Sequence, residues 1–215
     1  MLFMLLQTDL FAMDEGSIKF VCERVVSDPP LQKFVFELMR MRQSLYDIGL
    51  IGKYANGIGY GNVSIRAPDN KKQFLISGSA TGGIASLEPR HFARVDEYSI
   101  RDNWLRCFGQ IDASSESLTH AAIYETISKA GAVLHVHNKK MWLSLMKEFH
   151  FTSKEIAYGT PAMALEVERL VRDLIISKEK IFAMGGHESG VIAFGEDLEE
   201  ASQILLSYFY KCQSK

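Results

Sequence analysis

The feature that most constrains the fold is the hexapeptide Ala-Val-Leu-His-Val-His at residues 132–137. A short, almost continuously apolar run that follows a glycine is typical of a buried strand. Alternate side chains of a strand point to the same face, so the imidazoles of His135 and His137 project together and Val136 points the other way. We therefore expect a sheet in which two histidines share one face.

Around this strand the sequence alternates between helical and extended patterns. Apolar residues recur at three- and four-residue steps over residues 31–48, which predicts an amphipathic helix that ends at Gly49. We expect helices layered on a sheet (α/β or α+β), in one domain over residues 29–215 preceded by a helical N-terminal arm over residues 1–28. The predicted helices are 31–48, 114–130, 139–147, 161–177 and 198–211, and the predicted strands are 62–66, 73–76, 92–98, 132–137, 181–184 and 191–194, with a turn at 67–70 and a flexible polar loop at 77–83.

Composition and charge exclude several classes of function. The chain has 24 Lys and Arg against 26 Asp and Glu and no basic block, so no nucleic-acid partner is expected. Its three cysteines are far apart and form no CxxC pair, which argues against a disulfide framework and favours a reducing cytoplasm. The apolar start lacks a basic residue and is far shorter than the roughly 20 residues of a membrane span, so no membrane partner is expected.

The histidines suggest a metal site. Two imidazoles on one strand face, His135 and His137, are a natural start for a divalent ion, zinc first, although such a pair can also form separate hydrogen bonds. His187 lies between glycines, which let the backbone approach closely; it is either a third ligand or an exposed turn residue. Three histidines would leave an open position on zinc, as catalysis requires. His91 and His150 have no paired neighbour, and we expect them on the surface.

Glu116 is the candidate acid/base. It follows Ser114 and Ser115 at the start of a predicted helix, where a glutamate is also an ordinary first-turn cap. His120 lies four residues further on and shares its helix face. It could orient Glu116 or be a fourth metal neighbour, but a half-buried packing role is favoured.

Three short polar segments could cradle an anion. They consist of glycines and small polar residues, whose backbone N–H groups can face a phosphate or a carboxylate. Taken singly, each is also ordinary loop chemistry. The segments are Gly61-Asn62, Ser77-Gly78-Ser79 and Ser114-Ser115.

Taken together and in this order, these pieces resemble the class II aldolase/adducin family. The likeness extends over roughly residues 31–210. Each motif is loose by itself, but six of them in order at family-like intervals are improbable by chance. The matching segments are GNVSIR at 61–66, ISG at 76–78, SSE with THAAIY at 114–124, AVLHVH at 132–137, YGTP at 158–161, and Gly186-His187 before Gly190.

The resemblance implies a three-layer α/β/α sandwich around a mostly antiparallel sheet, usually assembled as a homotetramer. It implies zinc or another divalent metal, and it gives the acid/base role to Glu116. The implied metal ligands are His135, His137 and His187, and the implied phosphate-binding residues are Gly61, Asn62, Ser77, Gly78, Ser114 and Ser115.

The resemblance also implies a reaction. The default is a lyase (aldolase) that cleaves a small phosphorylated hydroxy-ketone, or a related hydroxy-carbonyl compound, through a metal-stabilised enediolate. A sugar-phosphate dehydratase or epimerase with the same metal site is an alternative. So is a non-catalytic, adducin-like interaction domain, although that branch lacks the metal ligands that this chain retains.

Departures from the family pattern leave the substrate open. Tyr60 stands where a smaller residue is common, and Glu188 places an acid beside a presumed ligand. Lys139 follows the histidine pair and is either a contact for an acidic substrate or a solvated helix-start residue, which is favoured. Some family members use tyrosines from a C-terminal tail, but Tyr208 and Tyr210 lie at helical spacing, and we expect them to pack.

Overall fold

We describe a computed structural model of the chain, over residues 17–67 and 72–214. The strands are β1 (Val21–Val26), β2 (Gly52–Lys53), β3 (Gly59–Tyr60), β4 (Asn62–Arg66), β5 (Phe74–Ser77), β6 (Phe92–Ser99), β7 (Trp104–Gly109), β8 (Ala132–His137), β9 (Ile181–Ala183) and β10 (Gly190–Gly195). The helices are α2 (Gln32–Asp47), α3 (Ser117–Thr126), α4 (Lys139–Lys147), α5 (Pro161–Ser177), α6 (Leu198–Gln213) and the short 3-10 turn η1 (Pro89–His91).

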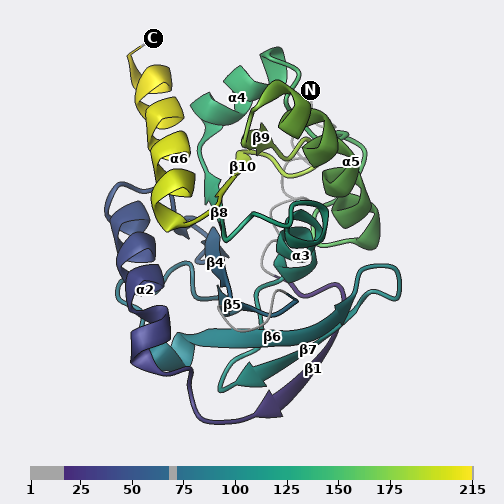
Figure 1. The fold of residues 1–215 in the computed structure, drawn as a ribbon. Helices are drawn as coiled ribbons and strands as arrows, with labels where there is room; N and C mark the ends of the chain where they lie inside the picture. Colours follow the sequence, from purple (N-terminus) through teal and green to yellow (C-terminus); the bar gives the residue numbers. More distant parts are fainter. Residues whose placement is uncertain (1–16, 68–71, 215) are drawn as a thin grey trace, which may run out of the picture.

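Eight of the strands form one sheet between two layers of helices (Figure 1). The strand order is β1-β7-β6-β5-β4-β8-β10-β9, and β2 and β3 form a separate hairpin. Only the β1–β7 pair is parallel among the described strands; the other neighbours are antiparallel. The predicted three-layer α/β/α sandwich with a mostly antiparallel sheet is therefore confirmed.

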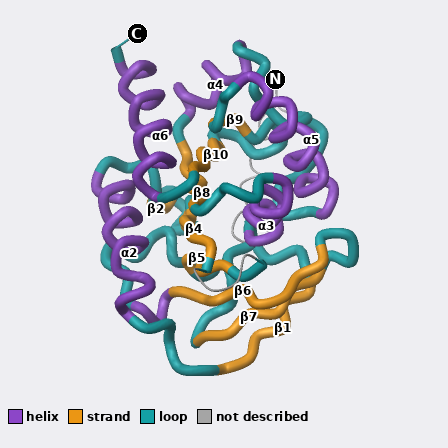
Figure 2. The backbone as a smooth tube through the Cα atoms, in the orientation of Figure 1, coloured by secondary structure: helices purple, strands orange, loops and turns teal. Residues whose placement is uncertain are grey.

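Each face of the sheet has its own apolar core. Helices α2, α4 and α6 cover one face, and α3 and α5 cover the other (Figures 1 and 2). Strand β8 contributes to both cores, because Leu134 and Val136 pack on the α2/α6 side while Val133 packs on the α3/α5 side. The strand alternates, so His135 and His137 lie on the same side as Val133 and face α3 and α5.

The register of β8 with its neighbours gathers polar residues at one place. In β4, Asn62 pairs with His135, and in β10, Gly190 pairs with His137. The turn that carries His187 lies immediately before Gly190. Sheet pairing thus brings together residues separated by more than a hundred positions in the sequence.

The expectation of a helical N-terminal arm is wrong for residues 17–28. Strand β1 lies there and pairs in parallel with β7, a strand that the sequence analysis missed. Parallel pairing across 83 residues leaves no local signal in either segment. It also brings Cys22 Sγ within 3.7 Å of Cys107 Sγ as free thiols, although the two cysteines are distant in the sequence. The remainder of the predicted arm, and residues 68–70 of the predicted turn, lie outside the described residues.

Helix α3 is shorter than the predicted 114–130. It ends before Ile127, which is extended, and the guanidinium of Arg66 donates a hydrogen bond to the Ile127 carbonyl. The helix therefore ends well before Gly131, although a helix up to residue 130 was predicted. A Cβ on Gly131 would lie 2.0 Å from the carbonyl oxygen of Glu196, so the glycine allows β8 to start against the loop after β10. No helix among residues 17–67 and 72–214 is long and apolar enough to cross a bilayer.

Candidate active site and metal centre

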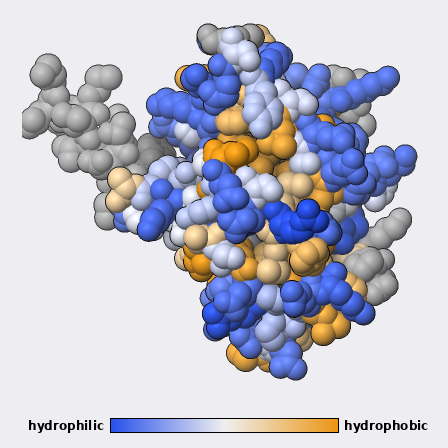
Figure 3. All heavy atoms as spheres, turned by 90° about the vertical axis from the view of Figure 1, so that its left-hand side faces the viewer, coloured by the Kyte–Doolittle hydropathy of each residue, from blue (hydrophilic) through white to orange (hydrophobic). Residues whose placement is uncertain are grey.

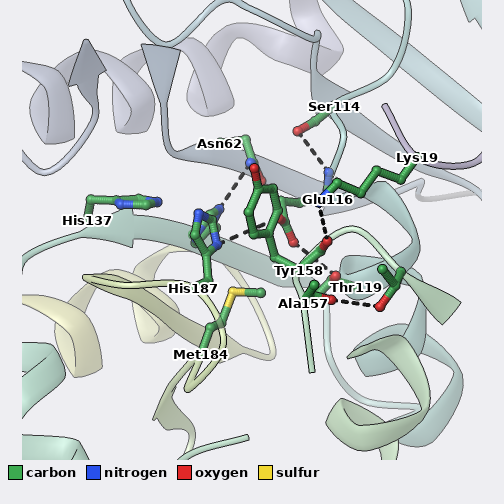
Figure 4. Close-up of polar contacts among 12 residues, drawn as sticks. Lys19, Asn62, Ser114, Glu116, Thr119, His137, Ala157, Tyr158, Met184 and His187 are labelled. Carbon is green, nitrogen blue, oxygen red and sulfur yellow. Dashed lines mark hydrogen bonds and ion pairs between the residues drawn. The ribbon is translucent and has the colours of Figure 1, made fainter. Parts of the chain in front are cut away.

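Three imidazoles converge beside the end of β8. His135 and His137 come from that strand, and His187 comes from the turn between β9 and β10. One nitrogen from each ring lies within 4.8 Å of the others, and all three side chains are buried. The three ring centroids are 4.7 to 5.2 Å apart, and Figure 4 shows His137 to the left of His187. This spacing is suitable for one metal ion.

The turn that carries His187 depends on glycines, as the sequence suggested. A Cβ on Gly185 would lie 2.0 Å from the carbonyl oxygen of Thr152, and one on Gly186 would lie 1.9 Å from that of Ile156. No other residue fits so close to another backbone. The His187 amide also donates to the carbonyl of Met184, which closes the turn. Close backbone packing therefore holds His187 over the end of β8.

Two residues contact the Nδ1 atoms of His135 and His137, the two histidines of β8. The hydroxyl of Tyr54 lies 2.7 Å from His137 Nδ1, and the amide nitrogen of Asn62 lies 3.2 Å from His135 Nδ1. His135 Nε2 and the amide oxygen of Asn62 are buried without a hydrogen-bond partner among the described residues. Rotating the Asn62 amide by half a turn would let its oxygen accept from Nδ1–H, the tautomer that leaves a lone pair on Nε2. This donor set fits a divalent ion.

The protonation state of these histidines also suits metal binding. Burial lowers the pKa of His135 well below its usual value, and the charges of His137 and His187 lower it further. Burial, and then the charge of His187, lower the pKa of His137 in the same way. Both rings are therefore neutral near pH 7, and neutral imidazole is the form that binds metals.

Glu116 is buried and directed at this cluster. It is the residue immediately before α3, and its carboxylate makes no capping bond to the helix backbone. Its Oε1 lies 3.7 Å from His187 Nδ1, and its Oε2 accepts a hydrogen bond from Thr119 Oγ1 at 3.0 Å. The amide of Glu116 donates to Ser114 Oγ (Figure 4). The Glu116 carboxylate therefore does not cap the helix, and it lies beside the imidazole of His187.

Tyr158 is a site residue to which the sequence analysis gave no role. Its ring stacks on His187 with centroids 4.0 Å apart and an interplanar angle of 19°. Lys19, from the segment before β1, places its ammonium group 4.0 Å from the Tyr158 ring centroid and donates to the Tyr158 carbonyl. Tyr158 stood in a matching segment, YGTP, but no local pattern indicated Lys19, which reaches the site only because β1 joins the sheet.

A cleft joins the carboxylate to most of the predicted anion segments. It is lined by Asn62, Gly61, Gly78, Ser114 and Ser115, as well as by Glu116, His135, His187 and Tyr158. The remaining lining residues come from the β3 segment and the 78–83 loop, namely Gly59, Tyr60, Ala80, Thr81 and Gly82. Ser77 is the exception among the six predicted phosphate-binding residues. Its hydroxyl accepts from the amide of Val63 at 3.2 Å and does not line the cleft.

Arg42 of α2 holds the loop that borders this cleft. Its guanidinium is buried and donates to the carbonyls of Thr81, Gly82 and Ala85. Burial lowers the pKa of Arg42, and the three carbonyls accept from three of its five N–H groups. The 77–83 loop, which we predicted to be flexible, is therefore fixed at Thr81 and Gly82 by hydrogen bonds from Arg42.

Several other candidates lie outside the cleft. His120 is fully buried and bonds to Ser64 Oγ at 2.7 Å, so it packs in the core. Glu188 and Lys139 are both exposed and pair with each other at the surface, so neither lines the cleft. The predicted residues that also remain outside the lining are His137, His91, His150, Tyr208 and Tyr210. We had expected Tyr210 to pack, but it is 58% exposed.

Comparison with known proteins identifies the family. The model of the class II aldolase and adducin N-terminal domain matches residues 50–214. The chain belongs to the class II aldolase and adducin family. No curated protein sequence matches it.

Solved structures of the same family share the fold. The chain superposes on YgbL from Klebsiella pneumoniae with a TM-score of 0.63 at 18% identity, covering 85% of this chain and 87% of that one; YgbL is described as a candidate aldolase, epimerase or decarboxylase. It superposes on an L-fuculose 1-phosphate aldolase with a TM-score of 0.62 at 17% identity, covering 86% and 84%. A class II aldolase superfamily protein from Pseudomonas syringae gives 0.60 at 20% identity, covering 87% and 76%. The TM-scores show a shared fold despite the low sequence identities.

Proposed function

We propose that this protein is a metal-dependent lyase that cleaves a small phosphorylated hydroxy-ketone. The observation that carries the proposal is a buried carboxylate, Glu116, directed at three buried imidazoles whose nitrogens lie within 4.8 Å of one another. His135, His137 and His187 would hold zinc or another divalent ion. Such an ion supplies Lewis acidity toward a substrate oxygen.

Glu116 is the proposed acid/base. Thr119 donates a hydrogen bond to Oε2, and Oε1 is the oxygen that lies beside His187, where proton exchange is proposed. The carboxylate lines the cleft, within reach of a molecule bound there. A base must approach the transferred proton to hydrogen-bond distance, and this placement supports that role.

The same cleft contains the proposed anion site. The backbone and hydroxyl groups of Gly61, Gly78, Ser114 and Ser115, with the amide of Asn62, would surround a phosphate. No Lys or Arg lines this cleft within the described part of the chain. Ser77 contributes indirectly, by supporting the end of β4 through its bond to Val63.

We further propose a homo-oligomer, probed first as a tetramer, in the cytoplasm. Apolar side chains gather on the face that carries α2 and α6 (Figure 3). Large exposed side chains there include Phe36, Ile48 and Tyr210. Exposed apolar surface of this kind favours association between copies.

A dehydratase or epimerase is the second candidate. One carboxylate beside a metal site can move a proton in each of these reactions, and YgbL, with the same fold, is described as a candidate aldolase, epimerase or decarboxylase. An adducin-like interaction domain has less support, because three buried histidines have no evident use in it.

The test is the Glu116→Gln variant, assayed with zinc against phosphorylated and unphosphorylated ketoses. Turnover is expected to fall by about 10²- to 10⁴-fold, while zinc content is unchanged. The matched control is Glu188→Gln, because Glu188 is next to a predicted ligand in the sequence yet pairs with Lys139 outside the cleft. An aldehyde product identifies a lyase and release of water identifies a dehydratase. Full activity in Glu116→Gln would refute the assigned role.

A further inference from the structure

The hairpin formed by β2 and β3 is attached to His137 at two points. The amide of His137 donates to the carbonyl of Leu50, just before the hairpin, at 2.9 Å. The ring of His137 contacts the Tyr54 hydroxyl through Nδ1 at 2.7 Å. The backbone and the side chain of this histidine are therefore both positioned by one short segment.

The hairpin itself holds Tyr54 in place. The Tyr54 amide donates to the carbonyl of Ile58, and its carbonyl accepts from the amide of Gly57. Gly57 has a φ of +85°, and the side chain of Asn56 accepts from the Ile58 amide, so the turn is closed by short-range bonds. The ring of Tyr54 packs on that of Tyr60 with centroids 4.7 Å apart. The hydroxyl is thus presented from a constrained backbone.

We propose that Tyr54 is a positioning residue of the metal centre: its hydroxyl holds His137 in the orientation and tautomer that direct Nε2 to the ion. The inference rests on the metal site of the proposed function. When Nε2 binds a metal, the proton of the neutral imidazole is on Nδ1, and the oxygen of a hydroxyl can accept the hydrogen bond from Nδ1–H. Such outer partners orient metal-binding histidines and increase their basicity.

Tyr60 provides a contrast within the same hairpin. Its ring also lies against His137, at a centroid distance of 5.2 Å, but its hydroxyl donates to the carbonyl of Gly49 at 3.4 Å instead of contacting an imidazole. Both rings therefore pack on His137, and the hydroxyl of Tyr54 is the one placed at its imidazole nitrogen. Removing each hydroxyl in turn separates hydrogen bonding from packing.

The experiment compares Tyr54→Phe with Tyr60→Phe in the full chain. Zinc affinity is measured by competition with a chelator, and the visible spectrum of the cobalt-loaded protein is recorded at saturating cobalt. Tyr54→Phe is expected to weaken zinc binding by about 10- to 100-fold and to shift the cobalt bands, whereas Tyr60→Phe stays within about threefold of the original affinity. Melting of both variants in excess chelator checks that the fold is retained.

The outcomes distinguish a failure of the Tyr54 inference from a failure of the metal-dependent function on which it rests. Equal zinc affinity in Tyr54→Phe and the unmodified protein would overturn the inference alone. An equal loss in both variants, with the same cobalt spectrum, would also overturn it, because packing would then explain the effect. If the unmodified chain binds neither zinc nor cobalt, the metal-dependent function fails, and this inference fails with it.

Discussion

Helices cover two parts of the sheet differently. We call strands β4, β8, β10 and β9 the inner half and strands β6, β7 and β1 the outer half; β5 lies between them. Every residue of β8, β10 and β9 is buried, because helices pack on both faces. Strand β7 alternates between buried and half-buried residues, and five of the six residues of β1 are exposed. Figure 2 shows β6, β7 and β1 at the lower end of the molecule, beyond most of the helices.

This difference in coverage coincides with the location of the candidate site. The buried imidazoles come from β8 and from the turn before β10, whereas no residue of β6, β7 or β1 lines the cleft. Removal from water keeps imidazoles neutral and strengthens electrostatic interactions, both of which a metal site needs. The outer half acts at a distance, since β1 carries the chain from Lys19, whose ammonium group lies over Tyr158. Coverage on both faces therefore distinguishes the half of the sheet that carries the candidate site.

The largest contrast in stability should come from matched truncations in the two halves. Phe182 of β9 is fully buried, and Phe182→Ala is expected to lower the unfolding free energy by about 3–5 kcal/mol because it leaves a cavity. Val26 of β1 is 76% exposed, and Val26→Ala should change it by less than about 0.5 kcal/mol. Urea unfolding of the metal-free proteins measures both. Similar losses would show that the two halves are equally packed.

The next contrast concerns metal binding by the histidines of the inner half. His137→Ala removes one of three converging nitrogens, and zinc affinity is expected to fall by at least about 100-fold, more than the loss of an outer partner causes. His150→Ala is the control, because His150 is partly exposed and outside the cleft. Zinc content after dialysis against a chelator gives the answer. Unchanged stoichiometry in His137→Ala would remove that residue from the ligand set.

The smallest effect concerns acid stability. Burial lowers the pKa of His120 to about 3, below its unfolded value of 6.5. As pH falls below 6.5, the unfolded chain takes up a proton that the native chain does not, so stability decreases by about 1.4 kcal/mol per pH unit for this residue. Between pH 7 and pH 5.5, His120→Gln should remove about 1 kcal/mol of the decrease.

The control for acid stability comes from the start of the outer half. His91 is only partly buried, and desolvation lowers its pKa too. Because solvent still reaches the ring, His91→Gln should change the pH dependence less than His120→Gln does. Urea unfolding of both variants at the two pH values tests this order, and the reverse order would contradict it.

Local sequence predicted the inner half more accurately than the outer half. Strand β8 and helices α4 and α5 have the predicted bounds, because continuous apolar runs and helical spacing are strong local signals. Strand β1 was mistaken for part of a helical arm and β7 was missed, since their pairing joins distant segments. Among site residues, Tyr54 and Lys19 were missed because each acts through a contact that no sequence pattern shows.

The sequence by itself determined the family, the sandwich class and the chemical types of residue available, because periodicity and motif order are written in neighbouring positions. The tertiary structure alone decided which of them meet. It brought three imidazoles together, turned Glu116 toward them and directed the Ser77 hydroxyl to β4. Distances between remote residues depend on strand register and backbone packing, and these are set only when the whole chain folds.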